Sequence, residues 1–316
     1  MRLLDRVRGL LRSSPTWVAL RRAQKEGWLR TLRRLKLWRR ILATPPVATA
    51  PRPAQGDLEV HLLCHRGDYL SAVWALKSFY HYASVDFPLV IHWNGPAWSA
   101  AWRRLRGHFP QAELVPQAEA DHAVTAELRR RGLPRLALAR RGSPFMLKLT
   151  DFAVCARARH VLALDADVLF FRRPAELLQA CQRRGPEFLF QRDPESTYNI
   201  APERARAELG VPLAERVNTG IMVYPREALD LALCERCLGH PEVARPSGFI
   251  EQTLYALCAS ARGRVAYLPG TYLVDLRAGL PSKGLVARHY AGPSRPLLTR
   301  EGMPYLLARC DFRRPA

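Results

Sequence analysis

Between Val60 and Leu164, short apolar runs alternate with longer segments whose apolar residues recur at helical spacing. The short runs have the length of strands, and the longer segments have the length of helices. In chain order we expect a strand at 60–64, a helix at 69–82, a strand at 87–93, helices at 98–108 and 145–156, and a strand at 160–164. Such alternation predicts a mostly parallel α/β sheet flanked by helices.

The N-terminal part of the chain differs in composition from the rest. Residues 1–43 carry thirteen Arg or Lys against Asp5 and Glu26, which gives this arm a net charge of +11 out of +21 for all 316 residues. Residues 44–56 contain four prolines among Ala and Thr, a composition typical of a semi-rigid linker. Since 48% of the residues are hydrophobic, we exclude global disorder and expect one catalytic domain over residues 57–316.

The arm contains the pattern of a basic amphipathic helix. Apolar residues recur at helical spacing, and basic residues lie on the flanks and back: Trp28, Leu32, Leu35, Trp38 and Leu42 against Arg33, Arg34, Lys36 and Arg40. Such a helix could lie on an anionic membrane surface or dock on its own domain, and the pattern fits both. Nucleic acid is the less favoured partner, because no basic-aromatic RNA motif accompanies the arginines.

Cysteine usage and hydropathy bear on the compartment. Seven cysteines are spread along the chain without the dense spacing of a disulfide scaffold, which favours a reducing environment. Cys234 and Cys237 form a CxxC with no second pair at zinc-site spacing, so we interpret it as a chance feature of a helix. No uncharged apolar stretch approaches the roughly 18 residues of a membrane span. We therefore expect a cytoplasmic protein, peripheral on the inner face of the membrane if the arm binds lipid.

The segment from Val161 to Phe171 carries the clearest chemical signal. An apolar run ends by presenting Asp165 and Asp167, which point the same way if the backbone is extended. Two adjacent carboxylates repel each other unless a cation lies between them. Carboxylate oxygens suit magnesium or manganese, which leave coordination positions free for substrate phosphates. An Asp-X-Asp alone also occurs in solvated turns, but here Pro174 and Glu176 indicate that a helix follows.

At this point the sequence resembles the GT-A glycosyltransferases, in particular the retaining enzymes of family 8, which include lipopolysaccharide sugar transferases and glycogenin. The resemblance spans roughly Val60 to Arg295, and it implies a GT-A-type α/β fold with a Rossmann-like, mixed, mostly parallel sheet flanked by helices. It rests on five ordered blocks: Lys148-Leu149, Asp165-Ala166-Asp167, Asn218-Thr219-Gly220-Ile221-Met222, Glu251-Gln252 and His289-Tyr290-Ala291-Gly292-Pro293-Ser294-Arg295.

The resemblance implies roles for the metal and the diphosphate. His289 would join Asp165 and Asp167 as the third metal ligand, Gly292 would let the backbone approach closely, and Arg295 would meet phosphate in place of the commoner Lys. Lys148 would meet the carboxylate cluster and the donor, although it could also be a surface lysine on its helix.

Other matching positions concern the sugar and the base. The resemblance places Gln252 at the reacting sugar face, with Glu251 standing in place of the usual Asp. Asp193 either accepts hydrogen bonds from donor hydroxyls or caps a loop, and Asn218 either contacts the donor sugar or lies in a turn before a strand. After the first strand the family often offers an acidic residue to the uracil base of the donor, and this chain departs from that pattern. Asp68 could still pair with a base there, and Tyr69 could stack on it.

The function implied is transfer of a sugar from a nucleotide-diphosphate sugar, with UDP as the nucleotide, to a saccharide or glycoconjugate acceptor such as an envelope saccharide. Manganese or magnesium would assist departure of the diphosphate, and the resemblance implies retention of anomeric configuration. The alternative is a GT-A-like module without turnover that attaches to anionic membrane surfaces.

Overall fold

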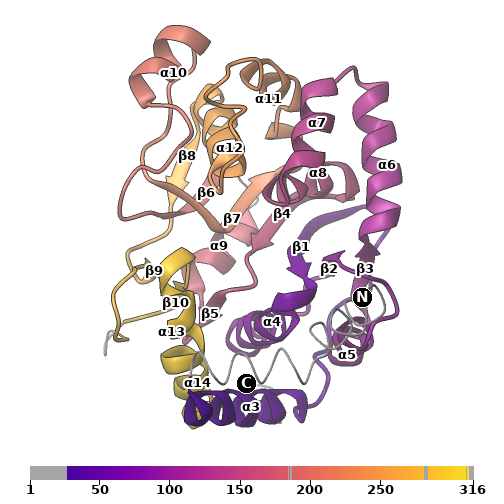
Figure 1. Cartoon of the computed structure of the whole chain (residues 1–316), viewed down its shortest axis with the longest axis vertical. Coiled ribbons are helices and arrows are strands. Elements are labelled where there is room, and N and C mark those ends of the chain that lie inside the picture. The colour runs from indigo at the N-terminus through magenta and orange to yellow at the C-terminus, as the bar shows by residue number, and fades with distance from the viewer. Residues whose placement is uncertain (1–26, 184, 186, 281–283, 311, 313–316) are drawn as a thin grey trace, which may run out of the picture. The chain divides into compact units, whose positions relative to one another are not determined.

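The computed structural model describes residues 27–183, 185, 187–280, 284–310 and 312 (Figure 1). The chain divides into two compact units, Met1–Thr44 and Pro45–Ala316. In the first unit the described residues form helix α3 (Trp28–Leu42), which confirms the helix expected there. Trp28, Leu32 and Leu35 are exposed on α3. The remainder of the arm, residues 1–26, lies outside the described residues.

The second unit is built on a seven-stranded sheet within the described residues, in the order β3-β2-β1-β4-β7-β6-β8. The strands are β1 (Gly56–His65), β2 (Leu89–Asn94), β3 (Glu113–Pro116), β4 (Ala158–Leu164), β6 (Phe188–Arg192), β7 (Val217–Pro225) and β8 (Val265–Tyr267). Strands β3, β2, β1 and β4 are mutually parallel, whereas β7 runs antiparallel to both β4 and β6. The expected mixed, mostly parallel α/β sheet is therefore confirmed.

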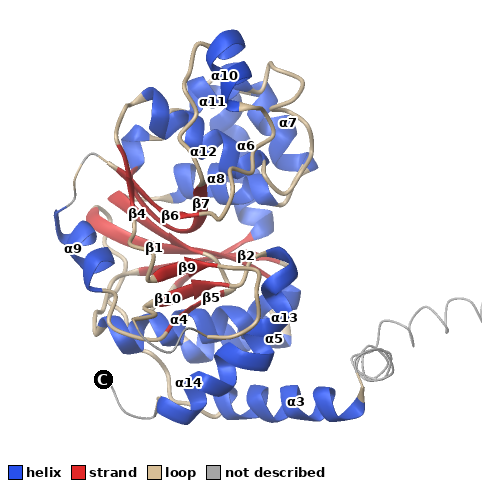
Figure 2. Cartoon of the chain, turned by 90° about the vertical axis from the view of Figure 1, so that its left-hand side faces the viewer, coloured by secondary structure: helices blue, strands red, loops and turns tan. Residues whose placement is uncertain are grey.

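Helices cover both faces of this sheet (Figure 2). Helices α6 (Gln117–Arg130), α7 (Pro134–Gly142), α8 (Phe145–Cys155) and α12 (Ile250–Ala261) lie on one face, and α4 (Tyr69–Ala83) and α5 (Ala100–His108) lie on the other. The remaining helices are α9 (Ala175–Arg183), α10 (Pro202–Leu209), α11 (Leu231–Cys237), α13 (Arg295–Leu297) and α14 (Met303–Arg309). None of the helices in the described ranges combines the length and the hydrophobicity that a membrane span requires.

A second, three-stranded sheet lies on the α4 side of the large one (Figure 2). It consists of β5 (Val168–Phe170), β10 (Ala287–His289) and β9 (Tyr272–Val274), with β10 in the middle. β10 runs antiparallel to β5 and places His289 opposite Val168. Because β5 begins three residues after Asp165, this pairing brings the C-terminal part of the chain to the end of β4.

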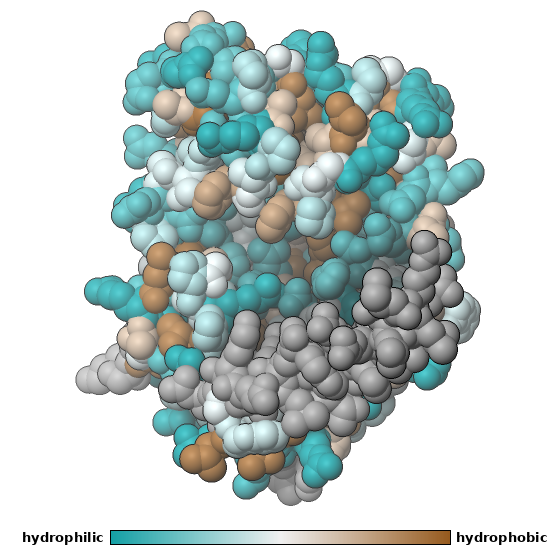
Figure 3. Space-filling view, in the orientation of Figure 1, coloured by the Kyte–Doolittle hydropathy of each residue, from teal (hydrophilic) through white to brown (hydrophobic). Residues whose placement is uncertain are grey.

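The packing between the large sheet and α8 and α12 is apolar. Phe188 on β6 and Tyr224 on β7 stack with their ring centroids 5.6 Å apart, and both side chains are fully buried. Burial of such aromatic rings is a large favourable contribution to folding. The face shown in Figure 3, by contrast, is mainly hydrophilic; its hydrophobic residues occur in small groups, and it is hollowed near its middle.

Most elements expected from the sequence are present, with shifted ends. The strand expected at 60–64 is β1, and the helix expected at 98–108 begins at Ala100. Cys234 and Cys237 lie on α11, as expected for a chance CxxC on a helix. One alternative was wrong: Asn218 does not lie in a turn, because it belongs to β7 and pairs with Gln191 at an irregularity between β6 and β7.

Candidate metal and diphosphate site

The candidate site lies where the strand order of the large sheet reverses. From β1 the chain proceeds to β2 and β3 on one side, then returns to place β4 on the other side of β1. The carboxyl ends of β1 and β4 therefore flank a gap that no crossover connection covers, which is where open α/β sheets bind ligands. Asp68 follows β1, and Asp165 follows β4.

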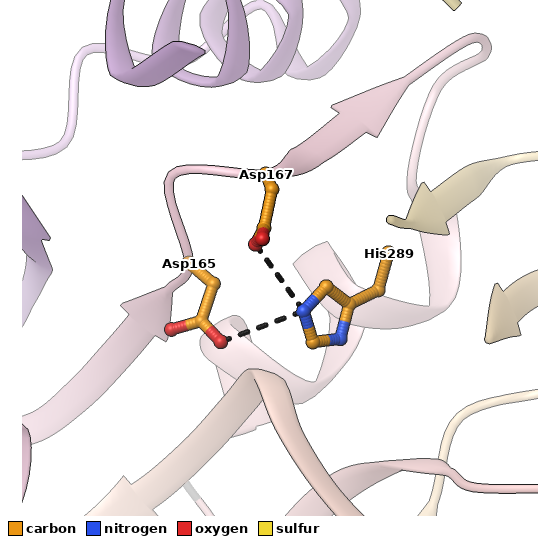
Figure 4. Close-up of side chains that lie close together, drawn as sticks. All are labelled: Asp165, Asp167 and His289. Atoms are coloured by element: carbon orange, nitrogen blue, oxygen red, sulfur yellow. Dashed lines mark ion pairs between the residues drawn. The ribbon is translucent and has the colours of Figure 1, made fainter. Parts of the chain in front are cut away.

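Two backbone hydrogen bonds fix the turn that carries both aspartates. The Asp165 amide donates to the Gly220 carbonyl of β7 at 2.9 Å, and the Val168 amide donates to the Asp165 carbonyl at 3.2 Å. The turn thus connects the carboxyl end of β4 to β5, and the side chains of Asp165 and Asp167 point toward His289 (Figure 4). The side chain of Asp165 is 29% exposed and that of Asp167 is 14% exposed.

His289 completes the cluster from β10. The Tyr290 amide donates to the Asp167 carbonyl at 3.0 Å, which locks β10 beside the turn. The His289 Nε2 atom lies 3.2 Å from Asp167 Oδ1 and 3.6 Å from Asp165 Oδ2 (Figure 4). One potential ligand atom from each of the three residues lies within 4.8 Å of the others. The structure therefore brings together the three residues that the sequence assigned to a metal.

Asn218 and Gly220 set the orientation of the His289 ring. Asn218 Oδ1 lies 2.8 Å from His289 Nδ1 and also accepts a hydrogen bond from the Gly220 amide at 3.0 Å. A proton on Nδ1 leaves the lone pair of Nε2 directed at the two carboxylates, as in protein metal sites. A Cβ atom on Gly220 would lie 2.3 Å from His289 Nδ1, so glycine is required for this close approach.

The donor set fits a divalent cation. Two carboxylate oxygens and one imidazole nitrogen converge, and carboxylates with imidazole suit manganese and related ions. Burial lowers the pKa of His289, but the Asp167 and Asp165 carboxylates outweigh burial and raise it. Burial raises the pKa of Asp167, but His289 and the charge of Arg295 outweigh burial and lower it. The cluster thus gathers negative charge that a proton or a metal ion can neutralise.

Lys148 clamps the other side of Asp165. Its Nζ donates to Asp165 Oδ1 and to the Thr219 carbonyl, both at 2.7 Å, and lies 3.4 Å from Glu251 Oε1. Glu251 in turn accepts a hydrogen bond from Thr219 Oγ1 at 3.2 Å. Burial raises the pKa of Glu251 despite the nearby lysine. Lys148 is only 5% exposed, so it is not a surface lysine.

Asp193 links Asn218 to Gln252. Asn218 Nδ2 donates to Asp193 Oδ1 at 2.8 Å, and Gln252 Nε2 donates to Asp193 Oδ2 at 3.2 Å and to the Thr197 carbonyl at 3.0 Å. Burial raises the pKa of Asp193, and the hydrogen bonds from Asn218 and Gln252 oppose that shift. A continuous hydrogen-bonded path thus runs from His289 through Asn218 and Asp193 to Gln252.

Arg295 joins the metal cluster to the end of β1. Its Nη2 lies 3.0 Å from Asp68 Oδ1 and its Nε lies 3.4 Å from Asp167 Oδ2. The side chain of Arg295 remains 44% exposed. Gly292 begins a 3-10 turn with a positive φ of 47°, which favours glycine, three residues after the end of the strand that holds His289.

The two residues that the sequence assigned to the nucleotide base, Asp68 and Tyr69, contact arginine side chains in the structure. Asp68 is paired with Arg295, and the Tyr69 hydroxyl accepts a hydrogen bond from Arg104 Nη1 at 2.7 Å. Both residues lie beside the candidate site, at the start of α4. Sequence reasoning missed the contact of Arg104 with Tyr69. It also missed that the Thr219 carbonyl binds Lys148 and that the absence of a Cβ at Gly220 makes room for His289. No residue pattern signals such backbone contacts.

No family model and no curated protein sequence matches the chain. Solved structures of similar fold include mouse xyloside xylosyltransferase 1 in its apo form, with 14% identity over 68% of this chain and 86% of that chain and a TM-score of 0.47. The apo bifunctional glycosyltransferase WbbM matches with 16% identity over 79% of this chain and a TM-score of 0.49, and the chain spans 48% of its length. The Mn/GDP form of core-mannan synthase A from Aspergillus fumigatus matches with 11% identity over 84% of this chain and 88% of that chain and a TM-score of 0.44. Because each of these TM-scores is below 0.5, the similarity to these structures does not indicate which reaction this protein catalyses.

Proposed function

We propose that this protein is a metal-dependent glycosyltransferase of GT-A type that transfers a sugar from a nucleotide-diphosphate sugar to a saccharide or glycoconjugate acceptor. The observation that carries the proposal is the convergence of Asp165, Asp167 and His289 beside the partly exposed side chain of Arg295. They meet at the reversal point of a mostly parallel sheet, where phosphate-containing ligands bind in open α/β folds.

The residues of the site have different roles in breaking the bond between the sugar and the diphosphate. A divalent cation held by the triad would neutralise the charge that grows on the leaving diphosphate. Arg295 binds the phosphate oxygens with its planar fork, and such placed charges are worth on the order of several kcal/mol of barrier. Lys148 holds Asp165 in position through its hydrogen bond and balances the charge of Glu251.

The path from Asn218 to Gln252 serves the sugar. Gln252 and Asp193 present a polar group to the ring as positive charge develops there, and Asn218 ties their orientation to that of His289. In keeping with the resemblance to family 8, the proposal includes UDP as the nucleotide and retention of anomeric configuration. Proton NMR of the first product formed measures the anomeric configuration. We expect retention, and an inverted product would contradict the proposed stereochemistry.

A thermal-shift panel tests the donor and the metal together. UDP, GDP, ADP, CDP and dTDP are each added with and without Mn²⁺, because a ligand that binds the folded state raises the melting temperature. We expect UDP with Mn²⁺ to give the largest rise, and Asp167→Asn and His289→Ala to abolish it. Glu227→Gln, an exposed carboxylate outside the cluster, is the matched control. A metal-independent rise that persists in both triad variants contradicts the proposal.

For the N-terminal arm we propose attachment to an anionic membrane surface. Helix α3 carries no acidic residue, and Trp28, Leu29 and Leu32 each expose more than half of their surface. Aromatic and aliphatic side chains beside cations suit the headgroup region of a bilayer. Deleting residues 1–43 should lower binding to phosphatidylserine vesicles in a flotation assay. Equal binding of the full and shortened chains contradicts this attachment.

A further inference from the structure

Two phenylalanines are exposed at the N-terminal ends of α8 and α12. Phe145, the first residue of α8, is 49% exposed, and Phe249, which directly precedes α12, is 43% exposed. Large apolar side chains are usually withdrawn from water, so an exposed pair at one place favours a binding role. Neither phenylalanine takes part in the metal and diphosphate site described above.

The two residues belong to one surface. A Cβ atom built on Gly248, the residue before Phe249, would lie 3.8 Å from the Cζ atom of Phe145. The Phe145 ring therefore lies close to the backbone that leads into Phe249. Because Gly248 has no side chain, nothing from this position covers the rings.

Both phenylalanines lie one helical turn from residues of the candidate site. Phe145 precedes Lys148 by three positions, and Phe249 precedes Gln252 by three, a spacing that places side chains on the same face of a helix. Lys148 contacts Asp165, and Gln252 contacts Asp193. Phe145 is thus one helical turn from a residue that holds Asp165, and Phe249 is one turn from a residue assigned to the reacting sugar.

Hydrogen bonds hold Phe249 in a defined position. Its amide donates to Ser247 Oγ at 3.0 Å, and its carbonyl accepts from the Thr253 amide at 2.9 Å and from Thr253 Oγ1 at 2.8 Å. The buried Asn199 ties down the preceding loop, since its Nδ2 donates to the Val243 and Arg245 carbonyls. With the backbone held, only the two side-chain torsions of Phe249 have to be ordered on binding, which keeps the entropy loss small.

We propose that Phe145 and Phe249 form a stacking platform for a pyranose ring of the acceptor, an inference that rests on the proposed function. The C–H face of a pyranose is apolar and stacks on aromatic rings, while its hydroxyls stay directed to water or to polar groups. The rings offer no partner for phosphate, whereas Arg295 does, so the platform takes a neutral sugar and leaves the diphosphate to the metal site. The adjoining Gln252 and Asp193 then place this acceptor beside the donor sugar.

Saturation-transfer NMR on the full chain tests the platform with methyl glucopyranoside, methyl galactopyranoside, methyl mannopyranoside and methyl xylopyranoside. Each is measured with and without UDP and Mn²⁺. We expect at least one glycoside to receive saturation on its ring C–H protons, with a loss of at least about five-fold in Phe249→Ala and Phe145→Ala. Phe249→Trp should restore the signal, because it keeps an aromatic face.

Leu138→Ala is the matched control, since Leu138 is 65% exposed on α7 and the signal should not depend on it. The platform is refuted if none of the glycosides receives saturation, if the signals survive both alanine substitutions, or if Leu138→Ala weakens them equally. The same samples report UDP binding. Glycoside signals that depend on the phenylalanines without any UDP response would support the platform and contradict the proposed donor.

Discussion

Two clusters of titratable side chains in the second unit differ in how their charged groups are arranged. In the first, which we call the β1 cluster, His61 Nε2 lies 2.9 Å from Glu59 Oε2, and His61 Nδ1 lies 2.9 Å from His92 Nε2. Arg52 binds Glu59 with two hydrogen bonds of 3.1 Å. In the second, the metal triad, Asp165, Asp167 and His289 converge on one point.

The pKa shifts reflect this difference. In the β1 cluster, burial raises the pKa of Glu59, but its hydrogen bonds to His61 and Arg52 outweigh burial and lower the pKa to about 2. Burial lowers the pKa of His61 and of His92. The β1 cluster therefore pairs the Glu59 carboxylate with Arg52, which also lies 2.8 Å from Glu113 Oε1, and its histidines are neutral. The triad holds two carboxylates around a histidine whose pKa they raise, with Lys148 beside Asp165 and Arg295 beside Asp167. We expect the first arrangement to stabilise the fold, and we propose that the second binds a divalent cation.

Substituting Gly220 should separate the two clusters most strongly. In Gly220→Ala the new Cβ would meet His289 Nδ1 at 2.3 Å, so the imidazole must leave its position. We expect Mn²⁺ affinity to fall by more than about 100-fold, since a ligand and its orientation are both lost. Isothermal titration with Mn²⁺ measures this. Gly107→Ala, where a Cβ meets nothing within 4 Å, should bind as the native chain does. Native affinity in Gly220→Ala would show that His289 is not a ligand.

Asn218→Ala should have a smaller effect on the same measurement. It removes the hydrogen bond that holds His289 Nδ1 but leaves the three ligands in place, and such partners are typically worth about 10–100-fold in metal affinity. Asn199→Ala is the control, because Asn199 is equally buried but bonds to the 243–245 backbone. An equal loss of Mn²⁺ affinity in both variants would mean that general destabilisation, not ring orientation, is responsible.

His61→Ala should affect stability instead of metal binding. It leaves His92 Nε2 without its buried partner and removes one of the hydrogen bonds to Glu59, which together cost about 2–4 kcal/mol of unfolding free energy. Urea denaturation at pH 7.5 measures this loss, and titration of the folded variant with Mn²⁺ should give the native affinity. Weakened Mn²⁺ binding with unchanged stability would reverse the roles assigned to the two clusters.

The smallest expected effect is on the pH dependence of stability. Because the folded-state pKa of His92 is lowered, the unfolded chain binds more protons below about pH 6.5, and stability falls as pH decreases from there toward the folded-state value. In His92→Asn this contribution is absent. The difference in unfolding free energy between native chain and variant should therefore shrink between pH 6.5 and pH 5 in urea titrations. A difference that grows on acidification would contradict a neutral His92.

Sequence reasoning found the parts of the fold that are encoded locally. The apolar run ending at Asp165 and the strand–helix alternation from β1 to α8 depend on neighbouring residues, and the structure has them. The short strand β10 was not predicted, because three residues are too few to show a hydrophobic periodicity. Its position comes from pairing with β5. Asn218 was ambiguous for the same reason: Asn-Thr-Gly has turn composition, but pairing of Asn218 with Gln191 of β6 keeps it extended.

The candidate site divides in a similar way. Asp165 and Asp167 were readable from the residues themselves, whereas His289, Gly292 and Arg295 were placed by resemblance to a family. The clamp of Lys148 on the Thr219 carbonyl and the contact of Gly220 with His289 depend on backbone approach, which the sequence does not display. The β1 cluster went unnoticed, because Glu59 and His61 alternate with apolar residues in a strand without any motif.

The most direct measurement is the position of a bound ion. Crystals soaked with Mn²⁺ and UDP, measured at the manganese absorption edge, should show an anomalous peak at coordination distance, about 2.0–2.6 Å, from Asp165, Asp167 and His289 Nε2, with the diphosphate on its open side beside Arg295. The proposed function predicts that His289→Ala crystals show this peak weakened or lost. A peak elsewhere, or nucleotide bound away from the triad, would contradict it.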